Sequence, residues 1–296
     1  MGTHRKRLWI DTDINPPVRK AGVVDEGSNV DDAVALLAAV AHPAVSLVGV
    51  STVGPDPERR AAVAVGLLAG AGVDLGSVPV VAGAGGPEGG GGTGGSPGGA
   101  GAGEDLSAVV EAVAASGAEA LLAIGPLTNV AAITAAGVRP PEVTIMGGAL
   151  RPVEHRGELR AVEHNFGSDP GAAAAVLAVP GAVLVPLDAT VATRLDARMA
   201  ARLMATAPVL EPMVSTWLEE WGEVVLHDPA ALLVAAGDGS ELGRFERRRL
   251  LVEPDGRLVD GGRGAAGTVH DVAASLFGSA VVASVLALLA DLGLSG

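Results

Sequence analysis

The sequence predicts an α/β protein with one Rossmann-like, mostly parallel sheet and helices on both of its faces. Short apolar runs alternate with longer Ala-rich runs along all 296 residues, no linker divides them, and 49% of the residues are hydrophobic. Such alternation gives a parallel sheet covered by helices, because a crossover must carry the chain back before the next parallel strand can start. We therefore expect residues 1–296 to form a single domain with a sizeable core.

The alternation can be followed element by element. The expected strands are residues 7–10, 45–53, 78–82, 120–124, 143–146 and 183–186. The expected helices are residues 30–41, 57–71, 106–116 and 170–178, together with one that begins at Val130. Ligands of such sheets bind beyond the carboxyl ends of the strands, which is where Asp13, Thr128 and residues 147–148 fall.

Two stretches depart from this alternation. The apolar run 269–294 is interrupted by Asp271, Gly278 and Asp291, so we expect a buried helix and no membrane span. Segment 83–103 consists mostly of Gly and cannot bury enough apolar surface to order itself. We expect this segment to be a flexible surface loop, with a mobile flap as the alternative.

Composition argues against several classes of function. The net charge of -14 makes a nucleic acid an unsuitable partner, because binding phosphates requires clustered Lys and Arg. The sequence has no Cys, which excludes disulfides, thiolate metal sites and cysteine nucleophiles. The basic N-terminus lacks the long apolar stretch of a signal peptide, so we expect a cytoplasmic protein. No dinucleotide fingerprint follows the first strand, which argues against a nicotinamide cofactor.

Four aspartates form the most informative local pattern. Asp11 and Asp13 close the first strand, and Asp31 and Asp32 open the next helix. Two acidic residues in a first helical turn are explained by the helix dipole alone. Four carboxylates at one strand end would repel one another unless a cation neutralises them, and hard divalent ions such as Ca²⁺ prefer oxygen ligands. The pattern therefore favours a metal or phosphate site.

Five segments, in a fixed order along the chain, carry a recognisable signature. They are Asp11-Thr12-Asp13 with Asp31-Asp32-Ala33, Gly125-Pro126-Leu127-Thr128-Asn129, Met146-Gly147-Gly148, Glu163-His164-Asn165-Phe166 with Asp169-Pro170, and Leu226-His227-Asp228-Pro229. In these segments the chain resembles the nucleoside hydrolases of the inosine-uridine-preferring type, over roughly residues 7–280. The resemblance implies the nucleoside hydrolase fold, hydrolysis of the N-glycosidic bond of ribonucleosides, a resident Ca²⁺, and assembly as a homodimer or homotetramer.

The resemblance also implies roles for individual residues. Asp13 would be the general base that takes a proton from a calcium-bound water. Ribose hydroxyls would be held by Asp31, Glu163 and Asn165. The full set of implied metal ligands is Asp13, Asp32, Asp228 and the backbone carbonyl of Thr128. The full set of implied substrate-binding residues is Asp31, Asn129, Met146, Glu163 and Asn165, where Asn129 has helix capping as an alternative role.

The chemistry of the bond gives a reason for further groups. Cleavage passes through an oxocarbenium-like state that nearby carboxylates stabilise, while the leaving base gathers negative charge. His227 is adjacent to Asp228 and has the pKa range of a proton donor, so we expect it to serve the leaving base. Trp217 and Trp221 are four residues apart on the expected helix 211–223 and share one face of it. They are candidates to stack on the nucleobase, with ordinary packing as the alternative.

The chain departs from the family pattern at four places. Residues 14–30 are an insertion between the two Asp pairs, and Asp25 within it is an alternative to Asp13 as ligand or base. The other three changes fall on segments that contact substrate in the family: Gly54-Pro55-Asp56 in place of Gly-Asn, segment 83–103 in place of a His-bearing loop, and Arg156-Gly157-Glu158 in place of a second Gly-Asn. We therefore expect a preserved metal-binding skeleton with altered substrate recognition.

Two alternative functions stay open at this point. A strand that ends in Asp-x-Asp also begins the haloacid-dehalogenase-like phosphatases, in which Asp11 would be the nucleophile and Asp13 the acid/base, with Mg²⁺. That class needs a downstream Lys, whereas the only Lys residues are Lys6 and Lys20. The altered recognition segments also fit a nucleoside-binding protein of the same fold that has lost turnover.

Overall fold

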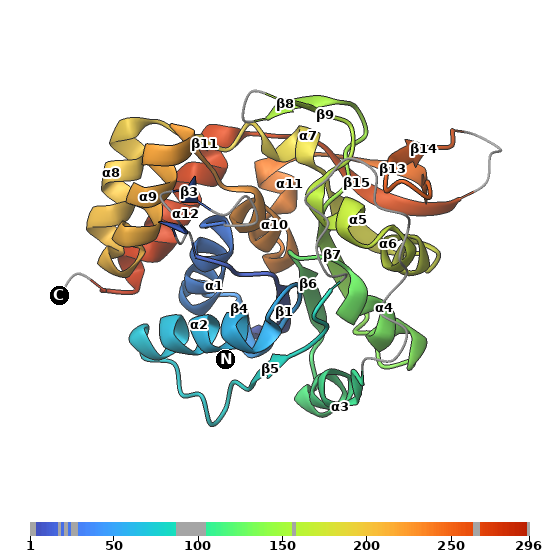
Figure 1. Ribbon diagram of the computed structural model, residues 1–296, viewed down its shortest axis with the longest axis horizontal. Coiled ribbons are helices and arrows are strands. Elements are labelled where there is room, and N and C mark those ends of the chain that lie inside the picture. The colour runs from blue at the N-terminus through green and yellow to red at the C-terminus, as the bar shows by residue number, and fades with distance from the viewer. Residues whose placement is uncertain are drawn as a thin grey trace.

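A nine-stranded sheet forms the centre of the computed structural model, which describes residues 4–16, 19–20, 23–24, 29–86, 105–155, 158–262 and 267–294. Its strand order is β14-β13-β15-β10-β7-β6-β1-β4-β5 (Figure 1). The strands are β1 Lys6–Thr12, β4 Val45–Thr52, β5 Val80–Ala82, β6 Ala120–Ala123, β7 Glu142–Met146, β10 Ala182–Val185, β13 Gly243–Val252, β14 Leu258–Asp260 and β15 Thr268–Leu276. Neighbours from β5 through β15 pair in parallel, and β13 runs antiparallel to β15 and β14.

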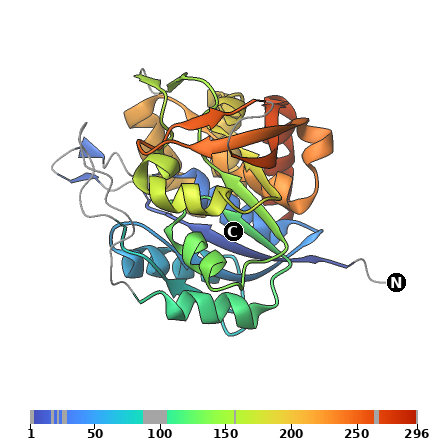
Figure 2. The ribbon, with the colours of Figure 1, turned by 90° about the vertical axis from the view of Figure 1, so that its right-hand side faces the viewer.

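Helices cover both faces of this sheet (Figures 1 and 2). Strand β1 shows why: Leu8 and Ile10 belong to one hydrophobic core, and Trp9 between them belongs to the other. Successive strand residues point to opposite faces, so a run of consecutive apolar residues such as Leu8-Trp9-Ile10 needs a cover on each side. The first core includes α1 Asp31–Ala41, α2 Pro57–Gly70, α8 Ala197–Thr206, α9 Glu211–Trp221, α10 His227–Ala236 and α12 Gly278–Asp291. The second core includes α3 Ser107–Ser116, α4 Thr128–Ala135 and α6 Pro170–Leu177.

Short elements complete the described part of the chain. Three two-stranded ribbons pair β2 Arg19–Lys20 with β3 Val23–Val24, β8 Val153–His155 with β9 Glu158–Arg160, and β11 Arg194–Leu195 with β12 Val224–Val225. The short helices are α5 His164–Ser168, α7 Leu187–Thr190, α11 Gly239–Leu242 and the 3₁₀ helix Pro208–Leu210. In Figure 2, β1 runs from the N-terminal marker towards the β2–β3 ribbon, so this ribbon stands at the carboxyl edge of the sheet.

The predicted mostly parallel sheet with helices on both faces is confirmed, and the helix predicted from Val130 starts at Thr128. The prediction of one buried helix over 269–294 is wrong. Strand β15 occupies the first part of this run, and α12 starts at Gly278, where a Cβ would lie 1.8 Å from the carbonyl oxygen of Ala192. Within the described residues no helix is both long and apolar enough to cross a membrane. Residues 87–104 lie outside those ranges, so the flexible loop over 83–103 stays a prediction.

Candidate active site

The carboxyl end of β1 lies inside the sheet, between β4 and β6. Val53 N donates a hydrogen bond to the carbonyl of Thr12 (3.0 Å), and Ile124 N donates to the carbonyl of Asp11 (2.8 Å). Asp13 follows directly, beside Gly125, where a Cβ would lie 2.8 Å from Asp13 N. The glycine at 125 therefore lets the loop after β6 approach the end of β1 closely. This geometry explains one glycine of the signature.

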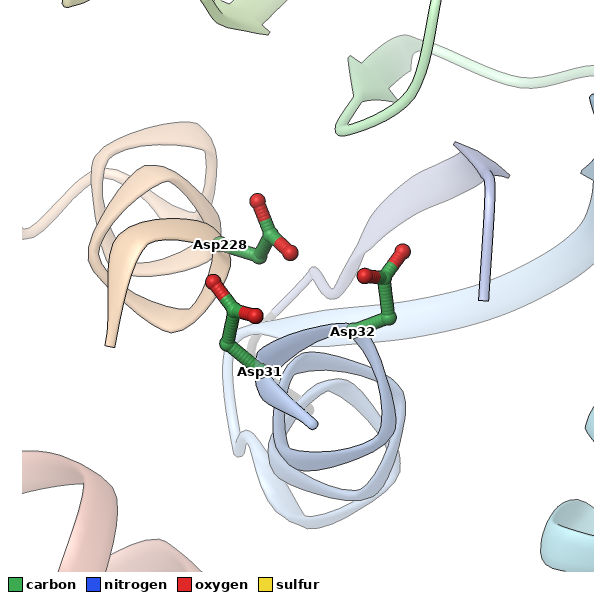
Figure 3. Close-up of side chains that lie close together, drawn as sticks. All are labelled: Asp31, Asp32 and Asp228. Atoms are coloured by element: carbon green, nitrogen blue, oxygen red, sulfur yellow. The ribbon is translucent and has the colours of Figure 1, made fainter. Parts of the chain in front are cut away.

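Three buried carboxylates converge next to this strand end. Asp31 and Asp32 open α1, Asp228 lies in the first turn of α10, and each offers an oxygen within 4.8 Å of the others (Figure 3). Both helices direct their N-terminal ends at the cluster, and the partial positive charge of a helix N-terminus favours acidic side chains. The sequence-based expectation that Asp32 and Asp228 share one site therefore agrees with their placement. We refer to Asp31, Asp32 and Asp228 as the carboxylate triad.

Burial and mutual repulsion disfavour the ionised form of the carboxylates in the triad. Burial raises the pKa of Asp32 and of Asp228 well above the ordinary range, and the surrounding aspartates raise both further. Thr12 donates its hydroxyl to Asp32 Oδ1, whereas no donor among the residues that the structure describes reaches the buried Asp32 Oδ2. A buried carboxylate oxygen without a donor, facing two further carboxylates, suits a hard cation. These three residues could therefore hold a metal ion.

Asp13 lies beside the triad without being part of it. Its charge raises the pKa of Asp32 and Asp228, and its own pKa is raised by burial, with His164 and Arg60 acting in the opposite direction. The insertion that follows Asp13 is closed at its base. Asn29 N donates to the carbonyl of Asn15 (3.0 Å), and Asn15 N donates to Asn29 Oδ1 (3.0 Å). The alternative residue, Asp25, lies outside the described residues.

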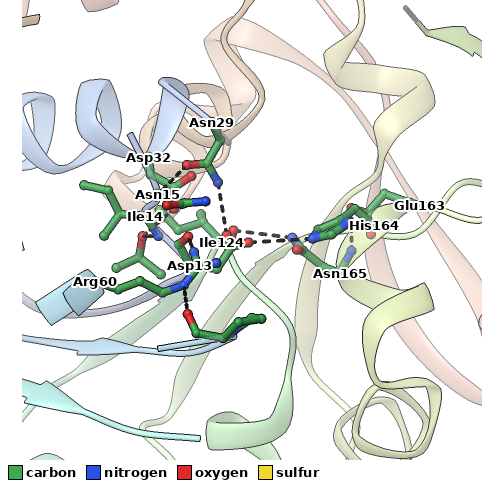
Figure 4. Close-up of polar contacts among 12 residues, drawn as sticks. Asp13, Ile14, Asn15, Asn29, Asp32, Arg60, Ile124, Glu163, His164 and Asn165 are labelled. Carbon is green, nitrogen blue, oxygen red and sulfur yellow. Dashed lines mark hydrogen bonds and ion pairs between the residues drawn. The ribbon is translucent and has the colours of Figure 1, made fainter. Parts of the chain in front are cut away.

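A second wall faces Asp13 across the site and carries Glu163, His164 and Asn165 (Figure 4). Glu163 caps α5: its Oε1 accepts from Asn165 N (2.8 Å), and its Oε2 accepts from Gly148 N (2.9 Å). Asn165 Nδ2 donates to the carbonyl of Met146 (3.2 Å). Glu163 and Asn165 are each 4% exposed, so much of their hydrogen-bonding capacity serves the protein itself. Met146 is equally buried beneath them.

His164 is the side chain of this wall that reaches into the site. Its side chain is 57% exposed, and its Nε2 lies 3.8 Å from Asp13 Oδ2. His164 lies within a signature segment, but its position in the sequence predicts no role, because spacing alone does not show which side chain of a short helix turns outward. The motif was therefore the only available signal for His164.

Thr128 is poorly placed for the role of backbone ligand. It is the first residue of α4, where a carbonyl is normally used by the helix, and its hydroxyl donates to Asp169 Oδ2 (2.7 Å). Ile124, directly after β6, is the better candidate: its carbonyl lies at the carboxyl edge, 3.4 Å from Asn165 Nδ2 (Figure 4). The residue type at position 124 gives no sign of this role, since a ligand that uses its backbone carbonyl can have any side chain.

Asn129, expected to bind substrate, is fully buried and has its partners inside the protein. Its Nδ2 donates to Asp11 Oδ1 (2.8 Å) and to the carbonyl of Thr52 (3.0 Å), and its Oδ1 accepts from Ala84 N (2.8 Å). The amide thus ties together β1, β4 and the segment after β5. Neither substrate binding nor helix capping describes this role.

An Asn129→Ala variant is therefore expected to lose about 2–4 kcal/mol of folding free energy, because three hydrogen bonds disappear and buried partners stay unsatisfied. Urea denaturation would measure the loss. The KM of the folded fraction should remain near the wild-type value. A large rise in KM with unchanged stability would instead support the substrate-binding role.

His227 and the two tryptophans differ in their access to the site. His227 begins α10, and its Nδ1 lies 2.7 Å from Thr190 Oγ1. Trp217 is 4% exposed within the first core, and its ring centroid lies 6.3 Å from that of the half-buried Trp221. The shared helix face is as expected, but Trp217 packs in the core and has no free face for a base. Stacking by Trp221 stays a prediction.

Fold and site together define an α/β protein with a cluster of buried carboxylates at the carboxyl edge of a parallel sheet. The chain belongs to the family of inosine-uridine preferring nucleoside hydrolases, whose sequence model matches residues 8–275. Members of this family hydrolyse the N-glycosidic bond of nucleosides.

Solved structures agree with this fold. A plant nucleoside hydrolase is 18% identical, with a TM-score of 0.74 over 96% of this chain and 99% of that chain. A purine-preferring ribonucleoside hydrolase from Gardnerella vaginalis is 19% identical, with a TM-score of 0.72 over 98% and 99% of the two chains. An inosine-uridine preferring nucleoside hydrolase from Bacillus anthracis is 18% identical, with a TM-score of 0.71 over 97% and 99%. A search of curated protein sequences gave no significant match.

Proposed function

We propose that this protein hydrolyses ribonucleosides with Ca²⁺ as its metal ion, at the site formed by the carboxylate triad and Asp13. The observation that carries the proposal is the convergence of Asp31, Asp32 and Asp228 from two helices at the end of β1. Family membership supports the reaction. The oxygen-only donor set supports a hard divalent ion, and a site that combines carboxylates with a backbone carbonyl suits the flexible coordination of Ca²⁺.

The metal would be held by Asp32 and Asp228, with Asp13 and the carbonyl of Ile124 at the same edge. The orphaned Oδ2 of Asp32 fits this assignment. Bound there, Ca²⁺ would orient a water and the ribose hydroxyls and lower the pKa of that water.

The side chains around the sugar would each do part of the work. Asp13 would accept the proton of the attacking water, since its carboxylate directly ends β1 and is 4% exposed. Asp31 would accept hydrogen bonds from ribose hydroxyls. Glu163 and Asn165 would contact the sugar from the facing wall, with the donor and acceptor positions that their hydrogen bonds inside the protein do not use. Together these carboxylates stabilise the positive charge that develops on the ring.

His227 would serve the leaving base. Thr190 Oγ1 donates to the carbonyl of Leu187 (3.1 Å), so its lone pair accepts from His227 Nδ1–H. This hydrogen bond fixes the ring with Nδ1 protonated and Nε2 directed away from Thr190. Nε2 would carry a proton for the base in the imidazolium form, in which both ring nitrogens are protonated.

A His227→Ala variant is expected to lose about 10²–10⁴-fold in turnover of purine nucleosides, which is the usual contribution of a positioned acid. Its affinity for Ca²⁺ should be unchanged. Steady-state ribose release and calorimetric titration would measure the two quantities. Loss of Ca²⁺ binding in this variant would place His227 in the metal site instead of beside the base.

Ribose release from a panel of purine and pyrimidine ribonucleosides, with Ca²⁺ and with a chelator, tests the function directly. We expect release with Ca²⁺ and none after chelation. Release of p-nitrophenol from p-nitrophenyl phosphate, but not from p-nitrophenyl riboside, would favour the phosphatase alternative. Calorimetric binding of a nucleoside without ribose release would favour a binding protein, an alternative motivated by the changed segments at 54–56 and 156–158.

We propose that residues 1–296 form one nucleoside hydrolase domain, that the protein is cytoplasmic, and that it assembles as a homodimer or homotetramer. The resemblance to the family supports the assembly. Sedimentation or light scattering of the purified protein would measure the oligomeric state.

A further inference from the structure

A buried arginine, Arg60, lies next to the site, and the helix to which it belongs does not explain its presence. Arg60 is 5% exposed and lies in the first turn of α2. A cation in the first turn of a helix opposes the helix dipole, and a buried guanidinium costs free energy unless it is paired. The reason for Arg60 must therefore lie outside its own helix.

The contacts of Arg60 lead to Asp13. Its Nε donates to the carbonyl of Pro55 (2.9 Å), and its guanidinium also donates to the carbonyl of Asp13 (Figure 4). Val53, directly after β4, donates to the carbonyl of Thr12, which is the last residue of β1. Arg60 therefore binds the carbonyl of Asp13, one residue beyond the end of β1.

The turn that carries Arg60 to this place has unusual backbone conformations. Asp56 has φ of 56° and is the only non-Gly residue with positive φ among the residues that the structure describes. Gly54 has φ of +97°, and a Cβ there would lie 3.4 Å from Arg60 Cζ. Strained backbone persists where its surroundings enforce it, and it is concentrated at functional sites. This turn is also one of the places where the chain departs from the family pattern.

We propose that Arg60 is a positioning residue, which fixes the backbone of Asp13 and thereby the direction of its carboxylate. The inference rests on the role proposed for Asp13 in catalysis and metal binding. The hydrogen bonds of Arg60 go to backbone carbonyls, so it would act through the Asp13 peptide. An error of about 1 Å in the place of a catalytic group costs roughly 10²-fold in rate, so such a clamp has a measurable effect.

The test compares Arg60→Gln and Arg60→Lys with a matched control, Arg7→Gln. Arg7 lies near the opposite end of β1 and also donates to two backbone carbonyls, those of Ser116 and Gly117. We expect Arg60→Gln to lower kcat by about 10²-fold while KM changes little, and to weaken Ca²⁺ binding roughly 10-fold. Arg60→Lys should recover part of both losses, because it keeps a donor for one carbonyl. Arg7→Gln should lower the melting temperature without changing kcat or Ca²⁺ affinity.

Two results of these assays would overturn the proposal. One is wild-type kcat and Ca²⁺ affinity in Arg60→Gln. The other is equal losses in Arg7→Gln, which would indicate a general effect on stability. If the wild-type protein releases no ribose from any nucleoside, the proposed function fails, yet the Ca²⁺ affinities still decide the role of Arg60. A crystal structure of Arg60→Gln provides a measurement independent of both. An unmoved Asp13 in that structure would refute the clamp.

Discussion

An Asp13→Ala variant is expected to release ribose at least about 10³-fold more slowly than the wild-type protein, and to lose most of its Ca²⁺ affinity. The variant removes the proposed general base, whose usual contribution is about 10²–10⁴-fold. It also removes negative charge from the buried cluster, where Asp13 acts on both Asp32 and Asp228. Single-turnover ribose release and calorimetric Ca²⁺ titration would measure the two losses.

The matched control is Asp238→Asn, which removes a carboxylate that pairs with His42 (3.0 Å) outside the site. This control should leave kcat and Ca²⁺ affinity unchanged. Retained turnover in Asp13→Ala would assign the base to Asp25 or reject the proposed mechanism. Intact Ca²⁺ affinity with lost turnover would limit Asp13 to the role of base.

Ca²⁺ and pH are expected to have linked effects on folding stability. Burial raises the pKa of Asp11 from 3.8 to about 7, and the pKa values of Asp32 and Asp228 also lie well above the ordinary range. Because these folded-state values exceed the unfolded ones, the folded protein holds protons that the unfolded chain releases between the two values. The stability of the metal-free protein should therefore fall as the pH rises from about 4 to about 7, by roughly 1.4 kcal/mol per pH unit for each proton.

Ca²⁺ should offset the part of this loss that comes from Asp32 and Asp228, because the ion replaces protons as the source of positive charge among those carboxylates. The part from Asp11, which accepts hydrogen bonds from Ser51 and Asn129, should remain. At about 100 times its Kd, the ion would add roughly 2.7 kcal/mol. For a protein of 296 residues that corresponds to a rise in melting temperature of roughly 4–5 °C. Calorimetric scans at several pH values, with Ca²⁺ and with a chelator, would measure both effects.

An Asp32→Asn variant separates the effect of carboxylate repulsion on folding stability from the effect of Ca²⁺ binding. Without metal it should be more stable than the wild-type protein near pH 7, since one of the mutually repelling carboxylates is gone. With Ca²⁺ it should gain little. A metal-free variant that is less stable than the wild-type protein would show that Asp32 supports the fold and not an ion site.

The sequence predicted the carboxylates of the site better than their surroundings. Asp31 and Asp32 open the helix as expected, and Asp228 meets them because α10 packs beside α1. A motif preserves residue types at fixed positions, so it predicts such a cluster well. It does not show which hydrogen-bond partner a side chain takes. Asn129 donates to Asp11 in the interior, and the hydroxyl of Thr128 donates to Asp169.

The remaining differences have similar physical causes. The run 269–294 has the length and apolar content of a helix, and only the pairing with β10 and β13 shows that its first part is a strand. Arg60 and His164 were not predicted from the sequence, because neither lies at a distinctive spacing from the aspartates. The tertiary structure places both beside Asp13. Local patterns therefore predicted the elements and the acidic residues, whereas contacts between distant segments determined the supporting groups.

The hydrogen bonds between Asn15 and Asn29 have an evolutionary consequence. They bring the two ends of the insertion together, so the distance along the chain between Asp13 and Asp31 is uncoupled from their distance in space. Relatives with a much shorter link between the same two aspartates can thus present an equivalent acidic surface. We therefore expect the length of the link between the two aspartates to be a poor guide to whether a homologue is active.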